Sequence, residues 1–193
     1  TGLLVPFFDF RALYAEDPSG FSNVINATLG GGGIILQTAV DSFEQQLARY
    51  VGCGYAVGTA DCTNAMQLGI RALDIGDGDE VIICSHTFVA TAQAIHFAGA
   101  VPVPVEMQSD RMINPEAITA SISQRTKAIL VTQLNGRICD MDRVREVADR
   151  HRILVLEDSA QALGAMFRGK RAGSFGKFGA FSFYPSKLLG GFG

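Results

Sequence analysis

An apolar run leads into a single lysine in the stretch Phe181-Ser182-Phe183-Tyr184-Pro185-Ser186-Lys187-Leu188-Leu189-Gly190-Gly191. Residues 179–183 predict a buried strand, and Pro185 marks the turn that follows it. Lys187 therefore lies where a buried strand delivers side chains into a crevice. Partial burial disfavours the charged ammonium, and the neutral amine is a nucleophile that forms Schiff bases with carbonyl compounds. An ordinary surface lysine in a loop is the alternative interpretation of this stretch alone.

Composition indicates one sizeable, interior-rich domain. The chain has 193 residues, of which 48% are hydrophobic and 18% charged, and the charged share lies below the roughly 25% of typical soluble domains. Such a balance favours an α/β core, with a buried subunit interface as a further possibility. The formal net charge of −3 gives no electrostatic support for nucleic acid or an anionic membrane as a partner.

Targeting and metal signals are missing from the sequence. No apolar run reaches the roughly 18 residues of a membrane helix, and the first residues lack the basic start of a signal peptide. The cysteines and histidines are scattered without metal-site spacing, at Cys53, Cys62, Cys84, Cys139, His86, His96 and His151. We therefore expect no metal site and free thiols in a reducing cytoplasm.

Apolar runs and helical periodicity alternate along the chain. Strands are predicted at residues 55–58, 80–84, 101–105, 128–132, 153–157 and 179–183. Helices are predicted at residues 38–50, 63–73, 87–97, 115–122 and 142–150. This order predicts an α/β three-layer sandwich with a mostly parallel sheet covered on both faces. Residues 1–33 predict an irregular arm with one possible short helix, so the expected organisation is an arm, 1–33, and a domain, 34–193.

Ligands of such sheets bind at the carboxyl ends of the strands, so the residues that follow each strand carry the functional information. After residues 55–58, Thr63 is a plausible N-cap, and the amides of Thr63 and Asn64 at a helix start would form an anion site suited to a phosphate. An ordinary capped helix is the alternative. After residues 80–84, Phe88 offers an aromatic ring that could stack on a flat cofactor or simply belong to the core.

Two further strand ends complete a constellation. Asp158 follows the apolar run 153–157, and a carboxylate there is costly unless a cation or hydrogen-bond donors satisfy it. A pyridinium nitrogen would be such a partner, whereas a helix-capping aspartate is the alternative. Ser182 places a hydroxyl near another strand end, where it could complete the phosphate site. Together with Lys187, these groups match the needs of pyridoxal 5'-phosphate (PLP).

The order of these motifs and the residues within them resemble those of the DegT/DnrJ/StrS family of PLP-dependent sugar aminotransferases, which have the aspartate-aminotransferase fold, fold type I. The resemblance is most specific in Glu157-Asp158-Ser159-Ala160-Gln161-Ala162 and in residues 181–187. It extends over nearly the whole chain through residues 6–9, 43–50, 76–81, 87–91 and 125–129.

The resemblance assigns roles to individual residues. It implies that Lys187 forms the Schiff base with PLP, that Asp158 pairs with the pyridine nitrogen, and that Phe88 stacks on the ring. It further implies that Gln161 lies near the phenolic oxygen of the ring. The phosphate-binding residues would be Thr63, Asn64 and Ser182, with Cys62 in the same loop also counted among the cofactor-binding residues. Residues 34–193 would then be an incomplete PLP-binding large domain.

Three departures from the family pattern stand out. Asp61-Cys62 replace the usual Ser-Gly before the phosphate-loop threonine, so Asp61 is expected to point away or cap the helix. Gln133-Leu134-Asn135-Gly136 replace the usual His-Leu-Tyr-Gly, which is expected to alter the substrate side of the pocket. Family members also continue well beyond the lysine, so the chain is interpreted as the N-terminal part of such an enzyme.

The predicted function is transfer of an amino group from an amino acid, L-glutamate, to a keto- or aldehydo-sugar, often nucleotide-linked, in polysaccharide or secondary-metabolite biosynthesis. The alternatives are a PLP-dependent sugar dehydratase of the same family, which carries histidine at the position of Lys187, and a non-catalytic truncated homologue. A homodimer is expected because subunits of this fold lend residues to each other's sites.

Overall fold

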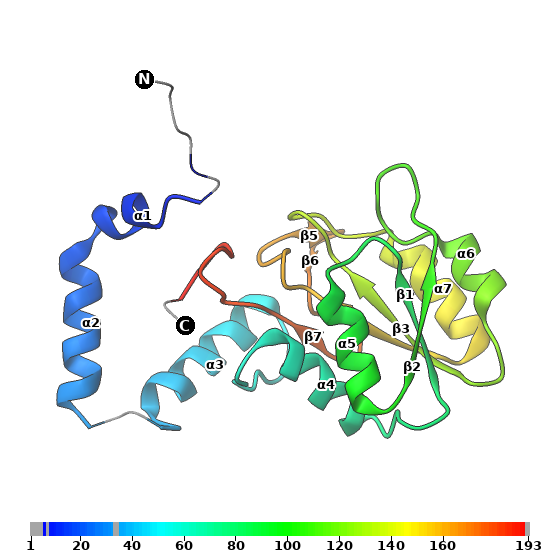
Figure 1. Cartoon of the computed structure of the whole chain (residues 1–193), viewed down its shortest axis with the longest axis horizontal. Coiled ribbons are helices and arrows are strands. Elements are labelled where there is room, and N and C mark those ends of the chain that lie inside the picture. The colour runs from blue at the N-terminus through cyan, green and yellow to red at the C-terminus, as the bar shows by residue number, and fades with distance from the viewer. Residues whose placement is uncertain (1–5, 7, 33–34, 192–193) are drawn as a thin grey trace.

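The computed structural model of the chain describes residues 6, 8–32 and 35–191, and its body is a five-stranded parallel sheet (Figure 1). The strand order is β2-β1-β3-β4-β7, and every neighbouring pair is parallel. The strands are β1 (Glu80–Cys84), β2 (Val101–Val105), β3 (Thr126–Thr132), β4 (Leu154–Asp158) and β7 (Gly179–Ala180). The predicted α/β class with a mostly parallel sheet is therefore confirmed.

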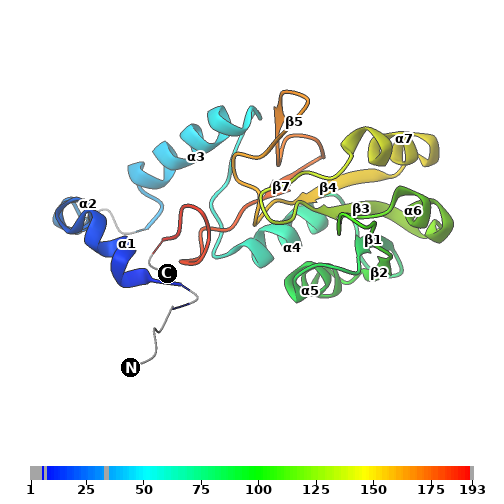
Figure 2. The same cartoon turned by 90° about the horizontal axis from the view of Figure 1, so that it is seen from above.

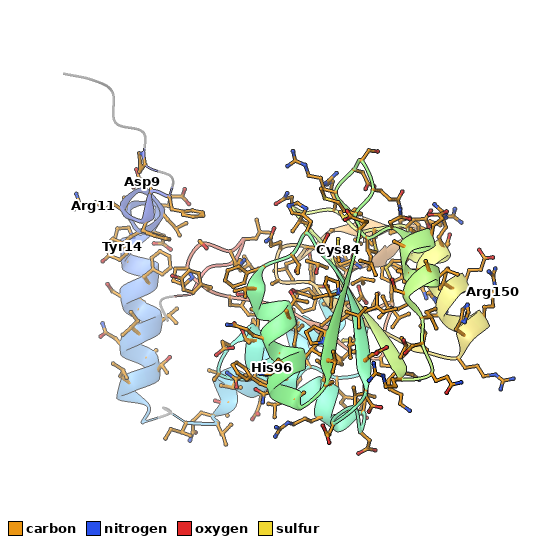
Figure 3. The ribbon with its side chains drawn as sticks, turned by 45° about the vertical axis from the view of Figure 1, so that its right-hand side comes forward. Asp9, Arg11, Tyr14, Cys84, His96 and Arg150 are labelled. Carbon is orange, nitrogen blue, oxygen red and sulfur yellow. The ribbon has the colours of Figure 1, made fainter. Side chains whose placement is uncertain are left out.

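Helices cover both faces of this sheet, as expected for buried parallel strands. On one face the core is built with α4 (Cys62–Ala72) and α5 (Val89–Ala98), and on the other with α6 (Pro115–Ser121) and α7 (Met141–His151). Figure 2 shows the two helix layers on opposite sides of the sheet. Figure 3 shows Cys84 within this body, whereas Arg150 extends from α7 into solvent.

Alternation along each strand divides the interior into two cores. In β4, Val155 belongs to the core beneath α6 and α7, whereas Leu156 belongs to the core beneath α4 and α5. The same alternation separates Ile129 from Leu130 in β3. Successive strand residues point to opposite faces, so the residues that end these strands must also diverge, Glu157 to one face and Asp158 to the other.

The N-terminal arm is helical, which corrects the prediction of an irregular segment. α1 (Phe10–Glu16) is capped by Asp9, and α2 (Pro18–Gly30) is capped by Asp17 with proline in its first turn. The carboxylates accept the amides of Ala12 and Gly20 at 2.9 and 2.8 Å, which is the usual role of an aspartate N-cap. The arm stands at one end of the molecule, apart from the sheet (Figure 1).

Several predicted boundaries shift, and one predicted strand is wrong. Residues 55–58 form no strand, and Tyr55 is 91% exposed; a strand needs a neighbour to satisfy its backbone. β7 is shorter than the predicted 179–183, and α5 begins two residues later than predicted. α3 (Thr38–Val51) was predicted, but the hairpin of β5 (Met166–Phe167) and β6 (Lys170–Arg171) was not.

The buried carboxylate of Glu157 joins the end of β4 to the loop that precedes β7. Oε1 accepts the amides of Phe175 and Gly176 at 2.6 and 3.0 Å, and Oε2 accepts the amide of Gly173 at 2.9 Å and Nε2 of Gln133 at 3.1 Å. The loop fits because it is glycine-rich. Gly173 has φ +85°, and a Cβ on Gly176 would lie 2.4 Å from the carbonyl oxygen of Val155.

We predict that Glu157→Gln lowers the free energy of unfolding by about 2–4 kcal/mol, because one acceptor oxygen becomes an amide group that faces two N–H donors. Urea denaturation of the full-length protein measures this loss. Glu146→Gln, on the exposed face of α7, is the control, since its ion pair with Arg150 is a surface pair worth under about 1 kcal/mol. Equal stability of the two variants would contradict the anchoring role of Glu157.

In the part of the chain that the structure describes, no helix combines the length and apolar character needed to cross a bilayer.

Candidate functional site

Asp158 is a buried carboxylate at the carboxyl end of β4, on the α4 and α5 face of the sheet. Its residue is only 4% exposed. Oδ2 accepts the hydroxyl of Thr91 at 2.7 Å, and Oδ1 accepts the amide of Ala160 at 3.1 Å. Burial raises the pKa of Asp158, and the bonds from Thr91 and Ala160 and the charge of Lys187 offset only part of that rise. The aspartate is not a helix cap, which was the alternative considered from sequence.

The two adjacent carboxylates differ in how fully they are satisfied. An ionised carboxylate offers about four acceptor positions. Within the described residues Glu157 accepts four N–H donors, whereas Asp158 accepts one donor on each oxygen. A buried carboxylate with unused acceptor capacity favours a further donor, above all a cationic one. This is the property that a pyridinium N–H requires of its partner.

Lys187 lies close enough to Asp158 to act on it electrostatically. The ammonium lowers the pKa of both Asp158 and Cys62. Its position comes from a tight turn, in which the amide of Lys187 donates to the carbonyl of Tyr184 at 2.8 Å. The turn also needs Gly190, because a Cβ there would lie 2.2 Å from the carbonyl oxygen of Pro185.

The first turn of α4 contributes Cys62 to the same site. Burial, followed by the charge of Asp158, raises the pKa of the Cys62 thiol to about 12, with Lys187 opposing the rise. The raised pKa disfavours the thiolate, which is the form that acts as a nucleophile and as a metal ligand. No group of three His, Cys, Asp or Glu in residues 6, 8–32 and 35–191 is arranged to hold a metal ion.

Asp61, not Thr63, is the N-cap of α4, which corrects the predicted cap. Asp61 Oδ1 accepts the amide of Asn64 at 2.8 Å, and Oδ2 accepts the side-chain Nδ2 of Asn64 at 2.7 Å. These bonds, the amide of Asn64 first, lower the pKa of Asp61. The expectation that Asp61 points away or caps the helix is confirmed, whereas the expectation of a free Asn64 amide is wrong.

The remaining predicted residues lie at the same edge of the sheet. Phe88 directly precedes α5 and is 67% exposed. Ser182 follows β7, and its Oγ accepts the amide of Tyr184 at 3.3 Å. Gln161 follows β4, and its Oε1 accepts the amide of Asn135 at 3.2 Å. Their contacts with a cofactor remain predictions.

One departure from the family pattern has a structural explanation. Gln133 is fully buried and faces away from Asp158, where its Nε2 donates to Glu157 at 3.1 Å and its Oε1 accepts the amide of Cys139 at 2.9 Å. Its side chain therefore supports the interior rather than the substrate side that was expected to change.

Sequence reasoning missed three threonines that lie behind Asp158, namely Thr87, Thr91 and Thr132. Their positions in the sequence, next to Phe88 and at a strand end, are the signal that could have identified them. Thr87 and Thr91 stand on either side of Phe88 at a helix start, and Thr132 is the register partner of Asp158 on the neighbouring strand.

Solved structures resemble the chain over most of its length. The Streptomyces venezuelae protein DesV, crystallised in complex with a ketimine intermediate, is 43% identical with a TM-score of 0.94, covering 98% of this chain and 51% of DesV. The Streptococcus pneumoniae protein Spr1654 in its PLP form is 30% identical with a TM-score of 0.85, covering 90% of this chain and 48% of that protein. The architecture is that of the large domain of fold-type I aminotransferases.

The family follows from the sequence comparisons. Residues 17–193 match the model of the DegT/DnrJ/EryC1/StrS aminotransferase family, and the chain belongs to that family. A Streptomyces venezuelae relative, dTDP-3-amino-3,4,6-trideoxy-alpha-D-glucose transaminase, is 43% identical over 98% of this chain and 50% of its own length. An Aneurinibacillus thermoaerophilus relative, dTDP-3-amino-3,6-dideoxy-alpha-D-galactopyranose transaminase, is 43% identical over 93% of this chain and 50% of its own length. The chain thus spans about half the length of these relatives.

We predict that Asp158→Asn stabilises the cofactor-free protein at neutral pH, raising Tm by about 3 °C, or about 1 kcal/mol in a chain of this size. When the folded-state pKa of an aspartate is raised above its unfolded value, its contribution to stability is fully present below the unfolded pKa. That contribution is lost as pH rises through the folded pKa. At neutral pH the unfolded aspartate is ionised and burial opposes that ionisation in the folded protein, a cost that asparagine does not carry, so the gain should vanish as pH falls toward about 4.

Thermal unfolding at a series of pH values checks this expectation, with the exposed Asp149→Asn as control. A variant that is destabilised at neutral pH, or a gain that does not depend on pH, would show that the carboxylate of Asp158 is not held against a desolvation cost.

Proposed function

We propose that the full-length protein is a PLP-dependent aminotransferase that moves an amino group from an amino acid, L-glutamate, onto a keto- or aldehydo-sugar carried by a nucleotide. The product would serve cell-surface polysaccharide or secondary-metabolite sugar biosynthesis. The observation that carries the proposal is the incompletely satisfied, buried carboxylate of Asp158 beside the amine of Lys187. Relatives named as transaminases of dTDP-linked amino sugars support the substrate class.

The residues present fit PLP as the cofactor. Asp158 would accept the ring N–H with its spare acceptor capacity, and Lys187 would attach the cofactor through Nζ as a Schiff base. Phe88 would stack on the ring, and Gln161 would lie near its phenolic oxygen. The phosphate would lie at the first turn of α4, held by groups of Cys62, Thr63 and Ser182. Asn64 would act mainly by holding the carboxylate of Asp61 aside, through its two bonds to Asp61.

When bound, PLP supplies an electron sink for the carbanion that transamination requires. An ionised Asp158 would favour the protonated ring nitrogen, because loss of that proton would leave a buried negative charge without its cation. Lys187 Nζ, once displaced by the amino donor, would accept the proton of the donor's Cα and hold it for return, which is the 1,3-proton shift that transamination requires. The raised pKa of the Cys62 thiol disfavours a role for it in proton transfer near physiological pH.

The alternatives receive less support. A sugar dehydratase of the family would carry histidine at the position of Lys187. A non-catalytic homologue has no need of a buried carboxylate with unused acceptor capacity. We further propose the division into an arm, 1–33, and a PLP-binding large domain, 34–193, and a cytoplasmic location, in keeping with four free cysteines.

We predict that Lys187→Ala abolishes covalent attachment of PLP and lowers the transamination rate by at least about 10²- to 10⁴-fold, the range that a general acid or base supplies. Mass spectrometry after borohydride reduction detects the attached cofactor, and amino transfer from glutamate to a dTDP-linked keto-sugar measures the rate. Lys177→Ala, which also removes a lysine after β4, is the control. Covalent PLP on Lys187→Ala would overturn the assignment.

A second proposal concerns assembly as a two-fold symmetric homodimer. Large apolar side chains are exposed on α2, α3 and α5, among them Val24, Leu29, Phe43, Phe97 and Phe88 before α5. Exposed apolar surface on this scale favours a covered interface. The self-complementary interface would bring the arm and the Phe88 segment close to the partner.

We predict that the full-length protein sediments as a dimer at micromolar concentration, since an obligate interface buries roughly 2,000 Å² or more. Analytical ultracentrifugation with a parallel activity assay tests this. A fully active monomer would show that one chain suffices to build the site.

A further inference from the structure

Three threonine hydroxyls form a continuous chain that ends on Asp158. Thr91 Oγ1 lies 2.7 Å from Asp158 Oδ2, Thr87 Oγ1 lies 2.7 Å from Thr91 Oγ1, and Thr132 Oγ1 lies 2.8 Å from Thr87 Oγ1. Thr91 and Thr132 are buried and Thr87 is partly buried. A hydroxyl chain of this kind is costly to bury unless each member is satisfied.

When Asp158 is ionised, its charge sets the direction of every bond in the chain. An ionised carboxylate only accepts hydrogen bonds, so Thr91 must donate its single proton to Asp158. Thr91 can then only accept from Thr87, and Thr87 in turn can only accept from Thr132. The three dipoles therefore point the same way, toward the carboxylate, and each bond polarises the next.

The chain also joins the segments that carry two candidate cofactor contacts. Thr132 and Asp158 are register partners at the ends of β3 and β4. Thr87 and Thr91 lie on either side of Phe88, which is the N-cap residue of α5 and has no side-chain cap of its own. The hydroxyl bonds therefore tie the turn that presents Phe88 to the strand that presents Asp158.

We propose that Thr91, Thr87 and Thr132 are positioning residues that orient the carboxylate of Asp158, keep it ionised in its buried site, and fix the Phe88 turn relative to it. The proposal rests on the proposed function only in taking Asp158 and Phe88 as contacts of PLP. The chain itself is present without any cofactor.

Other titratable groups face Asp158 within the described residues and must be separated from this effect. Lys187 favours the ionised carboxylate, and the charge of Asp158 in turn helps to raise the pKa of the Cys62 thiol on α4 to about 12. Asp61 at the start of α4 acts on Cys62 as well. None of these groups bonds to Thr87, Thr91 or Thr132, so substitution of a threonine changes the hydroxyl chain alone.

The test measures the titration of Asp158 in the full-length protein without cofactor, by carboxyl ¹³C NMR with the signal assigned from its loss in Asp158→Asn. Thr91→Val keeps the branched shape but removes the donor, and we expect the midpoint to move to higher pH. Thr132→Val, two bonds further along the chain, should move it in the same direction by less. Thr91→Ser should restore the wild-type midpoint, and Thr119→Val on α6, whose hydroxyl bonds only to its own helix, should leave it unchanged.

A second readout is the dissociation constant of PLP, measured by fluorescence quenching. We expect Thr91→Val to weaken PLP binding by about tenfold, the value of one lost hydrogen bond to a charged group, and Thr91→Ser to rescue it. Unchanged midpoints in folded Thr91→Val and Thr132→Val would overturn the proposal. If Thr91→Val does not fold, the midpoint of Thr132→Val decides alone. Failure of the proposed function would appear differently, as no PLP on Lys187 despite shifted midpoints.

Discussion

The rest of the site depends on the hydrogen bonds that the buried carboxylate of Glu157 accepts. One of its four N–H donors is the side chain of Gln133, in the loop that follows β3. The other three lie in the loop at residues 173–176. Three of these donors are backbone amides, so the carboxylate fixes the path of the chain and not merely a side chain. That path leads directly into β7 and on to Lys187. The position of the lysine is thus set by a group on the opposite face of the sheet.

Because successive strand residues point to opposite faces of the sheet, the neighbours Glu157 and Asp158 have different surroundings and different roles. Glu157 faces the core of α6 and α7, where charge-assisted bonds satisfy it, whereas Asp158 faces α4 and α5 with two donors. The four hydrogen bonds to the neighbouring Glu157 stabilise the chain at the same point and offset part of the free energy that burial of Asp158 costs. A rigid strand end keeps the carboxylate from turning toward water, so the demand for a cationic donor persists until a ligand meets it.

The sequence was a good guide wherever local pattern and tertiary structure agree. The bounds of β1 and β2 were predicted to the residue, because each is a continuous apolar run bounded by turns. Residues 55–58 have the same apolar pattern but no paired neighbour among the described residues, and pattern alone cannot supply one. Only one possible short helix was predicted in the arm, which has two, although Asp17-Pro18 is a strong start signal. The threonine chain was missed because its members lie on separate elements, with Thr91 and Asp158 67 positions apart and Thr132 brought to Asp158 by the register of β3 and β4.

At the start of α4, Asp61 in place of the family's usual serine changes how the site would bind its cofactor. Asp61 places a negative charge at a helix N-terminus, where it stabilises the helix dipole and accepts both nitrogens of Asn64. In the proposed function the same helix end also receives a phosphate, so part of its positive potential is already neutralised. The cofactor would then depend less on the phosphate and more on its two other attachments, the covalent bond to Lys187 and the ion pair with Asp158. Both of those attachments trace back to β4, whose end is fixed by Glu157 on one face and by Thr91 on the other.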